Sequence, residues 1–265
     1  MDTFQIISLA IVQGLTEFLP VSSSGHLILP ARLLGWQDQG LTFDVATHLG
    51  TLLAVILYFR KDIGLLTKDW IRSLIGKGTT RHSQMAWFII LATIPAVIFG
   101  LIIKKSGLDE SMRSLSVIVA TTLIFGALLG IADYFGKCSK PLELMGASQA
   151  IGIGFAQMLA IIPGTSRSGI TITAALMLGF TREASARFSF LLSIPIIIGA
   201  GLLLSVDFLK ANTPIDWYAI IMGTSVSGLS AFLCIHLFLN VINRIGLMPF
   251  VVYRLALGLV LFFAI

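Results

Sequence analysis

The chain has 265 residues, of which 56% are hydrophobic and 12% are charged, and its mean hydropathy is +0.95. Soluble domains carry about a quarter charged residues, so this composition excludes an ordinary soluble protein and predicts a chain that lies within a membrane. The net charge of +5 does not indicate nucleic-acid binding, because the basic residues lie between apolar stretches rather than in one patch. Cys138 and Cys234 stand too far apart for a metal motif, and two cysteines make no disulfide framework.

The first apolar stretch, Phe4–Leu19, is short for a membrane span. As a helix it would be about 24 Å long, whereas the hydrocarbon core of a bilayer is about 30 Å thick. It lacks the basic segment that begins a signal peptide, so we expect it to stay in the mature protein. The stretch meets Pro20, three serines and Gly25 before apolar character resumes at Leu27. Because backbone polar groups at membrane depth need protein or water partners, this pattern predicts a re-entrant helical hairpin.

Three stretches with the length of transmembrane helices come next, and a second interrupted segment follows them. The expected spans are approximately Phe43–Phe59, Met85–Ile103 and Leu115–Phe135. Ile151–Ile162 then runs into a polar break at residues 163–169, and apolar character resumes at Ile170. Three further spans are expected at Phe188–Val206, Trp217–Leu239 and Pro249–Ile265. An ordinary loop between two short helices remains the alternative to a hairpin at either break.

The two breaks resemble each other, which predicts an internal repeat. Both begin with proline, contain several hydroxyl residues and end in Ser-Gly, and each has a glutamine upstream, at Gln13 and Gln157. A hairpin returns to its own side and three spans then cross, so the second half must insert upside down relative to the first. We therefore expect an all-α polytopic membrane protein with six transmembrane helices plus two re-entrant helical hairpins, arranged as an inverted-topology repeat. Its halves are residues 1–140 and 141–265, within one membrane domain.

The basic residues predict the orientation of this arrangement. The 60–84 loop carries six of them: Arg60, Lys61, Lys68, Arg72, Lys77 and Arg81. Loops on the same side add Lys137, Lys140, Arg182, Arg187 and Arg244, and the opposite loops carry Arg32, Lys104, Lys105, Arg113 and Lys210. Because cytoplasmic loops are enriched in Lys and Arg, we expect the 60–84 loop in the cytoplasm and both termini outside. The first hairpin then opens outward and the second opens inward.

Ionisable side chains within membrane segments mark a functional site by default. The candidates in the two breaks are Glu17, Ser22, Ser23, Ser24, His26, Ser166, Arg167, Ser168 and Thr171. A serine hydroxyl is a potential nucleophile, and a histidine is a potential general base, acid or nucleophile. A carboxylate can orient the histidine or hold a divalent cation, while arginine and helix N-terminal amides suit a phosphate group. These groups predict one anion-handling site that is equipped for phosphoryl transfer.

Other ionisable residues are weaker candidates. Asp44 and Asp133 lie near the ends of expected spans, which favours interfacial or capping roles. His48 is expected to be an ordinary core histidine, and for Arg254 both structural pairing and substrate contact stay open. On these residues alone, two functions fit: a phosphatase, or a secondary transporter or flippase for an anionic lipid or solute. The Ser-Ser-Ser-Gly-His sequence beside Glu17 favours bond breaking.

Two motifs carry a family resemblance. Gln13–His26 (QGLTEFLPVSSSGH) and Pro163–Thr171 (PGTSRSGIT) resemble the signature motifs of the bacterial undecaprenyl-diphosphate phosphatases, also called bacitracin-resistance proteins. The resemblance extends over essentially the whole chain, including Phe188–Pro195 and Pro249–Arg254. It implies a multi-pass hydrolase of the bacterial cytoplasmic membrane that removes the terminal phosphate of undecaprenyl diphosphate and recycles the lipid carrier for cell-wall synthesis. Its active site would be reached from the outer face.

The resemblance also implies roles for particular residues. The residues at the family's catalytic positions are Glu17, Ser23, His26 and Arg167. The residues at the positions that the family uses for substrate binding are Ser166 and Thr171. We add Gln13, Ser22 and Ser168 to the expected substrate-binding residues. Membrane lipid is an expected partner and nucleic acid is not; the oligomeric state stays open, with a homodimer as one alternative.

Gln13 marks a departure from the family pattern. Many members have glutamate at this position, which gives two carboxylates on one helix face. The implied divalent cation, Mg²⁺ or Ca²⁺, would here depend on Glu17 together with substrate phosphates and water.

Overall fold

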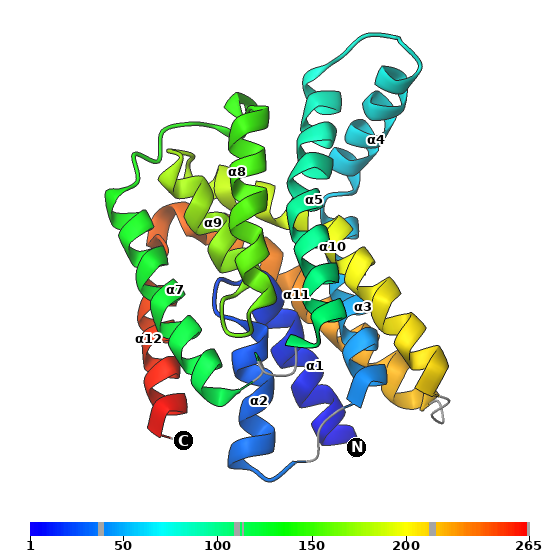
Figure 1. The fold of residues 1–265 in the computed structure, drawn as a ribbon, viewed down its shortest axis with the longest axis vertical. Helices are drawn as coiled ribbons and strands as arrows, with labels where there is room; N and C mark the ends of the chain where they lie inside the picture. Colours follow the sequence, from blue (N-terminus) through cyan, green and yellow to red (C-terminus); the bar gives the residue numbers. More distant parts are fainter. Residues whose placement is uncertain (37–39, 109–111, 113, 212–215, 264–265) are drawn as a thin grey trace.

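The computed structural model describes residues 1–36, 40–108, 112, 114–211 and 216–263, and these residues form helices joined by short turns (Figure 1). The chain up to residue 135 contains α1 (Thr3–Phe18), α2 (Ser23–Leu33), α3 (Gly40–Tyr58), α4 (Arg60–Leu74), α5 (Arg81–Ser106) and α7 (Leu115–Phe135). The chain from residue 142 contains η1 (Leu142–Leu144), α8 (Ala147–Met158), η2 (Leu159–Ile161), α9 (Arg167–Met177), α10 (Arg182–Ala211), α11 (Trp217–Ile245) and α12 (Met248–Phe263). In this described part the only β pairing is an isolated bridge between Lys140 and Phe180.

The predicted all-helical membrane class is confirmed. Within the described residues, four helices are long and apolar enough to cross a membrane: Arg81–Ser106, Leu115–Phe135, Arg182–Leu203 and Trp217–Ile245. A fifth is reached if Thr42–Tyr58 and Arg60–Leu74, which are bent by 79° at their junction, count as one span. Large apolar side chains also cover much of the surface; Leu202 and Leu229 are each 65% exposed. Such a surface suits contact with lipid tails.

Each of the six predicted spans coincides with a helix, namely α3, α5, α7, α10, α11 and α12. The last predicted span ends at Ile265, and its final two residues, 264–265, lie outside the described part. Asp133 accepts hydrogen bonds from Leu247 N at 3.1 Å and from Arg182 Nε at 2.5 Å. It ties the end of α7 to the starts of α10 and α12.

We expected a loop at residues 60–84, and the structure corrects this expectation. The first part of this stretch is α4, which runs beside α5 as an antiparallel pair (Figure 1). The polar composition of this segment hid the helix, because it buries Leu66 while most of its charged residues stay at the surface. Thr80 caps α5 and donates a hydrogen bond to the Asp69 carboxylate at 2.7 Å, which fixes the turn between the two helices.

Small residues let the central helices approach closely. Both α1 and α3 pack along α11. A Cβ atom at Gly14 would collide with the backbone carbonyl of Ser227, and one at Gly50 would collide with that of Thr224. Close packing through glycine is how helices associate in a membrane, where lipid tails compete with apolar side chains.

Both chain ends lie at the end of the molecule opposite the α4–α5 turn (Figure 1). This placement agrees with the predicted pairing of the two termini on one side. The α1–α2 and α8–α9 connections are largely buried: Val21 and Ser22 lie in the interior in the first, and Gly164 and Thr165 in the second. The fold therefore buries much of both polar breaks that the sequence singled out.

Candidate active site

The two breaks share one local conformation. Ser22 and Ser166, which precede α2 and α9, have φ values of 74° and 70°, a region that non-glycine residues rarely occupy. Each serine caps its helix: Ser22 Oγ accepts from Gly25 N at 3.4 Å, and Ser166 Oγ accepts from Gly169 N at 3.1 Å. In each break the hydroxyl of the capping serine lies 3.2 Å from that of the serine two residues later. Similar sequences thus produce the same strained cap twice.

The two breaks contact each other. Gly164 N donates to Ser24 Oγ at 3.1 Å, and Ser168 Oγ donates to the Leu19 carbonyl at 2.8 Å. These reciprocal hydrogen bonds join segments about 140 residues apart in the sequence. They satisfy backbone groups that a break in a buried helix leaves without partners.

An ion pair completes the junction. Arg167 Nη2 lies 3.2 Å from Glu17 Oε1, and the side chains are only 11% and 9% exposed. The other Glu17 oxygen, Oε2, accepts from Gln13 Nε2 at 2.9 Å and lies 3.9 Å from His48 Nε2. Arg167 also donates to the Ser189 carbonyl at 3.2 Å, so its guanidinium is fixed from two sides. The predicted carboxylate and the predicted anion clamp are therefore direct partners.

A second buried arginine, on α12, bonds to the backbone of the second break. Arg254 is fully buried, and its Nη2 donates to the carbonyls of Gly164 at 2.9 Å and Thr165 at 3.0 Å. Thr121 of α7 adds a hydrogen bond from its hydroxyl to the Pro163 carbonyl at 2.6 Å. Three carbonyls of the break thus accept hydrogen bonds from side chains of α7 and α12.

A cavity of about 290 Å³ lies between the breaks. Its wall includes six of the candidate site residues: Glu17, Ser22, Ser23, Ser24, Ser166 and Arg167. Thr16 and His48 complete the polar part, and Ile161, Ile162, Ile196, Ile197 and Ala200 form most of an apolar part. A carboxylate, a guanidinium, several hydroxyls and an apolar wall fit a phosphate group attached to a lipid chain.

Four predicted site residues lie outside the wall of this cavity. Gln13 is buried against Glu17, and Ser168 is bonded to Leu19 as described above. Thr171 is 1% exposed, and its hydroxyl contacts Arg167 O at 2.8 Å and Ser189 Oγ at 2.7 Å, so it supports the turn that carries Arg167. His26 points toward α12, where its Nε2 lies 2.6 Å from the hydroxyl of Tyr253.

The comparison with known proteins identifies the family. The model of the family described as "Bacitracin resistance protein BacA" matches residues 6–260. A curated relative from Alteromonas mediterranea (strain DSM 17117 / CIP 110805 / LMG 28347 / Deep ecotype), named undecaprenyl-diphosphatase, is 59% identical over 261 residues, which cover 98% of each chain. The chain belongs to the BacA family. The resemblance inferred from the two motifs is confirmed over nearly the full length.

In this BacA-family chain, sequence reasoning missed two features of the site. His48, which we expected to be an ordinary core residue, lies in the cavity wall beside Glu17. Ser189 contacts both Arg167 and Thr171, although its position in the Phe188–Pro195 stretch gave no sign of that role. The heptad-like spacing from Asp44 through His48 to Thr51 on α3 is the signal that marks His48, because it places three polar side chains on one face of an apolar helix.

The donor set next to the cavity suits a divalent cation only in part. Gln13 Oε1 is buried and has no hydrogen-bond partner among the described residues, and it belongs to the same side chain that contacts Glu17. An amide oxygen and one carboxylate are hard oxygen ligands, and Mg²⁺ commonly takes one or two carboxylates with the rest of its shell from water and substrate phosphates. No group of three or more His, Cys, Asp or Glu side chains gathers in the described part of the chain. Any cation here would therefore share its shell with the substrate.

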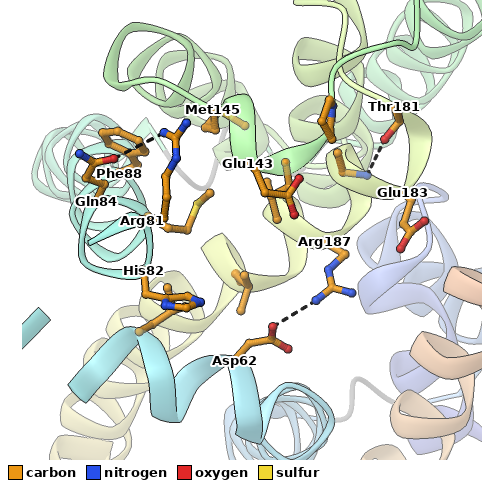
Figure 2. Close-up of a pocket in the computed structure, with 16 residues that line it drawn as sticks. Asp62, Arg81, His82, Gln84, Phe88, Glu143, Met145, Thr181, Glu183 and Arg187 are labelled. Carbon is orange, nitrogen blue, oxygen red and sulfur yellow. Dashed lines mark hydrogen bonds and ion pairs between the residues drawn. The ribbon is translucent and has the colours of Figure 1, made fainter. Parts of the chain in front are cut away.

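A second cavity lies at the N-terminal ends of α5 and α10 (Figure 2). It measures about 380 Å³, and its wall carries both signs of charge, including Asp62, Arg81, Glu143 and Arg187. Arg187 donates to Asp62 at 3.1 Å across this cavity, and Arg81 reaches toward Gln84 (Figure 2). It contains no residue of either signature motif, so its larger size does not make it the reaction site.

Proposed function

We propose that this protein hydrolyses undecaprenyl diphosphate to undecaprenyl phosphate and inorganic phosphate, and so recycles the lipid carrier of cell-wall synthesis and supports bacitracin resistance. The observation that carries the proposal is the Glu17–Arg167 pair at 3.2 Å, which joins the two signature motifs at one cavity that Ser23 also lines. The relative from Alteromonas mediterranea, with 59% identity over 98% of each chain, supports the substrate.

The proposed reaction begins with the diphosphate in the cavity and the prenyl chain against its apolar side. Arg167 holds the terminal phosphate together with the N-terminal amides of α9. The Ser23 oxygen attacks the terminal phosphorus, the bond from this phosphorus to the bridging oxygen breaks, and undecaprenyl phosphate leaves. Water then attacks the phosphoserine and releases inorganic phosphate. Catalysis of this kind rests mainly on positioning and on neutralising charge.

Proton transfer is assigned to two histidines at different distances from the cavity. His26 lies one turn of α2 from Ser23, and it is proposed to handle the Ser23 proton once its Nε2 is released from the contact with the Tyr253 hydroxyl. His48 lies on the cavity wall, 3.9 Å from the carboxylate of Glu17, and so offers a second acceptor. A phosphoryl-enzyme trapped on His26 instead of Ser23 would overturn the serine mechanism.

We further propose a divalent cation, Mg²⁺ or Ca²⁺, that is held by Glu17, by Gln13 Oε1 and by the substrate. When bound, it would neutralise charge on the diphosphate oxygens. Its ligands in the protein would be released from their present contacts, since Glu17 is paired with Arg167 and bonded to Gln13.

The proposed topology has six transmembrane helices plus two re-entrant hairpins, α1–α2 and α8–α9, in an inverted repeat with halves at residues 1–140 and 141–265. The matched caps of Ser22 and Ser166 and the reciprocal bonds between the breaks support a repeat. The basic α4–α5 turn is proposed to face the cytoplasm, with the reaction cavity reached from the outer face of the cytoplasmic membrane. Labelling of a cysteine placed at Lys77 from the cytoplasmic side only would support this orientation, and labelling from outside would reverse it.

Phosphate release from undecaprenyl diphosphate by purified protein in detergent tests the function. Glu17→Gln, Ser23→Ala and Arg167→Ala should each lower turnover by orders of magnitude in folded protein, whereas Ser148→Ala, at an exposed position of α8, should not. A chelator should also lower turnover if the cation is required. Absence of release by well-folded protein would favour a transporter or flippase for an anionic lipid. Native mass spectrometry would show the proposed homodimer as twice the 28.6 kDa chain.

A further inference from the structure

His26 is held by a residue from the far end of the chain. It lies in the first turn of α2, and Tyr253 lies in α12. The two rings are stacked with centroids 5.4 Å apart and an angle of 7° between their planes. The hydroxyl oxygen of Tyr253 lies 2.6 Å from Nε2 of His26. Stacking and a hydrogen bond together fix both the plane of the imidazole and its rotation.

The second ring nitrogen determines the tautomer. Nδ1 of His26 lies 2.7 Å from the carbonyl oxygen of Ser22, and a carbonyl oxygen only accepts hydrogen bonds. Nδ1 therefore carries a proton. In the neutral imidazole the lone pair is then on Nε2, and it accepts the hydrogen bond that the Tyr253 hydroxyl donates.

The hydrogen bond to the Ser22 carbonyl is important because Ser22 has a strained backbone conformation. Ser22 has a φ of 74°, is 1% exposed and stands directly before Ser23. A non-glycine residue stays in this region only when its surroundings hold it there. The Nδ1–H of His26 is one such restraint, and the cap from Ser22 Oγ to Gly25 N is another. The position of the proposed nucleophile thus depends on a hydrogen bond that only one tautomer of His26 can donate.

We propose that Tyr253 is a positioning residue for the phosphatase reaction: its hydroxyl, bonded to Nε2, holds the His26 ring in the orientation in which Nδ1–H meets the Ser22 carbonyl, and so places Ser23 on the cavity wall. This inference rests on the proposed function of Ser23. Tyr253 itself lies outside the cavity wall defined by the described residues, and its side chain is 47% exposed. It acts on the reaction through His26 and not through contact with the substrate.

Tyr253→Phe tests the proposal, because it keeps the stacked ring and removes only the hydroxyl. Phosphate release should fall about tenfold in kcat with KM unchanged, the size expected for one lost hydrogen bond in an orienting network. Tyr218→Phe is the matched control, since the Tyr218 hydroxyl also makes a hydrogen bond, to Thr3 at 3.2 Å, but lies away from the breaks. It should retain wild-type kcat.

Combining Tyr253→Phe with a second substitution, at His26, shows whether Tyr253 acts through His26. In His26→Asn the amide nitrogen can still donate toward Ser22 while nothing remains at the Nε2 position. Adding Tyr253→Phe to His26→Asn should cause no further loss. An equal loss in both backgrounds, or wild-type kcat for Tyr253→Phe alone, would overturn the proposal.

Nitrogen NMR of ¹⁵N-histidine-labelled protein gives a readout that does not need turnover. Wild-type His26 should show a protonated Nδ1 and an unprotonated Nε2 that accepts a hydrogen bond, and Tyr253→Phe should shift the Nε2 resonance toward that of an unprotonated nitrogen without a donor. An unchanged Nε2 resonance in Tyr253→Phe would also reject the proposal. If wild-type protein released no phosphate, the proposed function would fail, and the nitrogen measurement would still decide the link between Tyr253 and His26.

Discussion

Arg167 and Glu17 form an ion pair that connects the two signature motifs across 150 residues of sequence, with Nη2 3.2 Å from Oε1. Both side chains are largely buried, so each charge depends on the other for neutralisation. The same pair borders the cavity that Ser23 lines. Its two members therefore stabilise the junction of the breaks and are also the groups proposed to bind the diphosphate.

A double-mutant cycle should separate these two contributions. Glu17→Gln or Arg167→Met alone leaves a buried charge without its partner, which is expected to cost about 3–5 kcal/mol of stability. The double variant removes both charges and should recover much of that loss. Turnover should stay lower by a factor of about 10² or more in all three variants, because each lacks part of the site.

Thermal unfolding in detergent and phosphate release measure the two effects. Additive losses of stability in the double variant would show that the ion pair contributes nothing to folding. Recovery of turnover along with stability would show that neither side chain is needed for the reaction.

Gly164 is the glycine of the second break whose replacement should be most damaging. Its φ is +88°, and a Cβ atom there would lie 2.6 Å from the Ile118 carbonyl and collide with the Thr121 hydroxyl. Gly164→Ala is therefore expected to abolish turnover or folding through strain and a backbone clash. Gly152→Ala, in the preceding helix α8, meets no atom within 4 Å and is the matched control. The expression level, melting temperature and phosphate release of the two variants test this prediction. Near-normal turnover of Gly164→Ala would contradict the backbone conformation described for Gly164.

Much of the fold could be predicted from the sequence, because hydropathy and motif chemistry are local properties. Apolar runs located a helix at each of the six expected positions, and Pro, Ser and Gly located both breaks. The α4 helix was missed because its charged residues resemble those of a solvated loop. The partners of His26 and Arg254 could not be predicted, since Tyr253 and Gly164 lie 227 and 90 residues away and only tertiary packing brings them together.

Arg254 is expected to act on the site through the backbone that it holds. Arg254→Met leaves the Thr165 carbonyl without its buried donor, at a cost of about 1–3 kcal/mol, and leaves the Gly164 carbonyl with only the Thr122 hydroxyl at 3.4 Å. It also removes a positive charge next to the turn before α9, which is proposed to bind the phosphate. KM for undecaprenyl diphosphate should therefore rise about tenfold or more.

Arg244→Met is the matched control for this change. Arg244 is exposed at the end of α11, so its replacement should leave KM unchanged. Kinetics of purified protein with undecaprenyl diphosphate compare the two variants, and an unchanged KM for Arg254→Met would reject a role in substrate binding.

Replacing two different glutamines of α8 should change the free energy of unfolding in opposite directions. Gln157 is 1% exposed, and both polar atoms of its amide lack a hydrogen-bond partner within the described residues. Gln149 instead accepts a hydrogen bond from Gly146 N at 2.8 Å and closes the cap of the same helix. Gln157→Met should raise the free energy of unfolding by about 1–3 kcal/mol, because it removes an unsatisfied buried amide, whereas Gln149→Met should lower it by about 1 kcal/mol. Unfolding midpoints of both variants in one detergent check the contrast. A fall for Gln157→Met would mean that an internal water satisfies the amide, and it would place a hydrated pocket beside the second break.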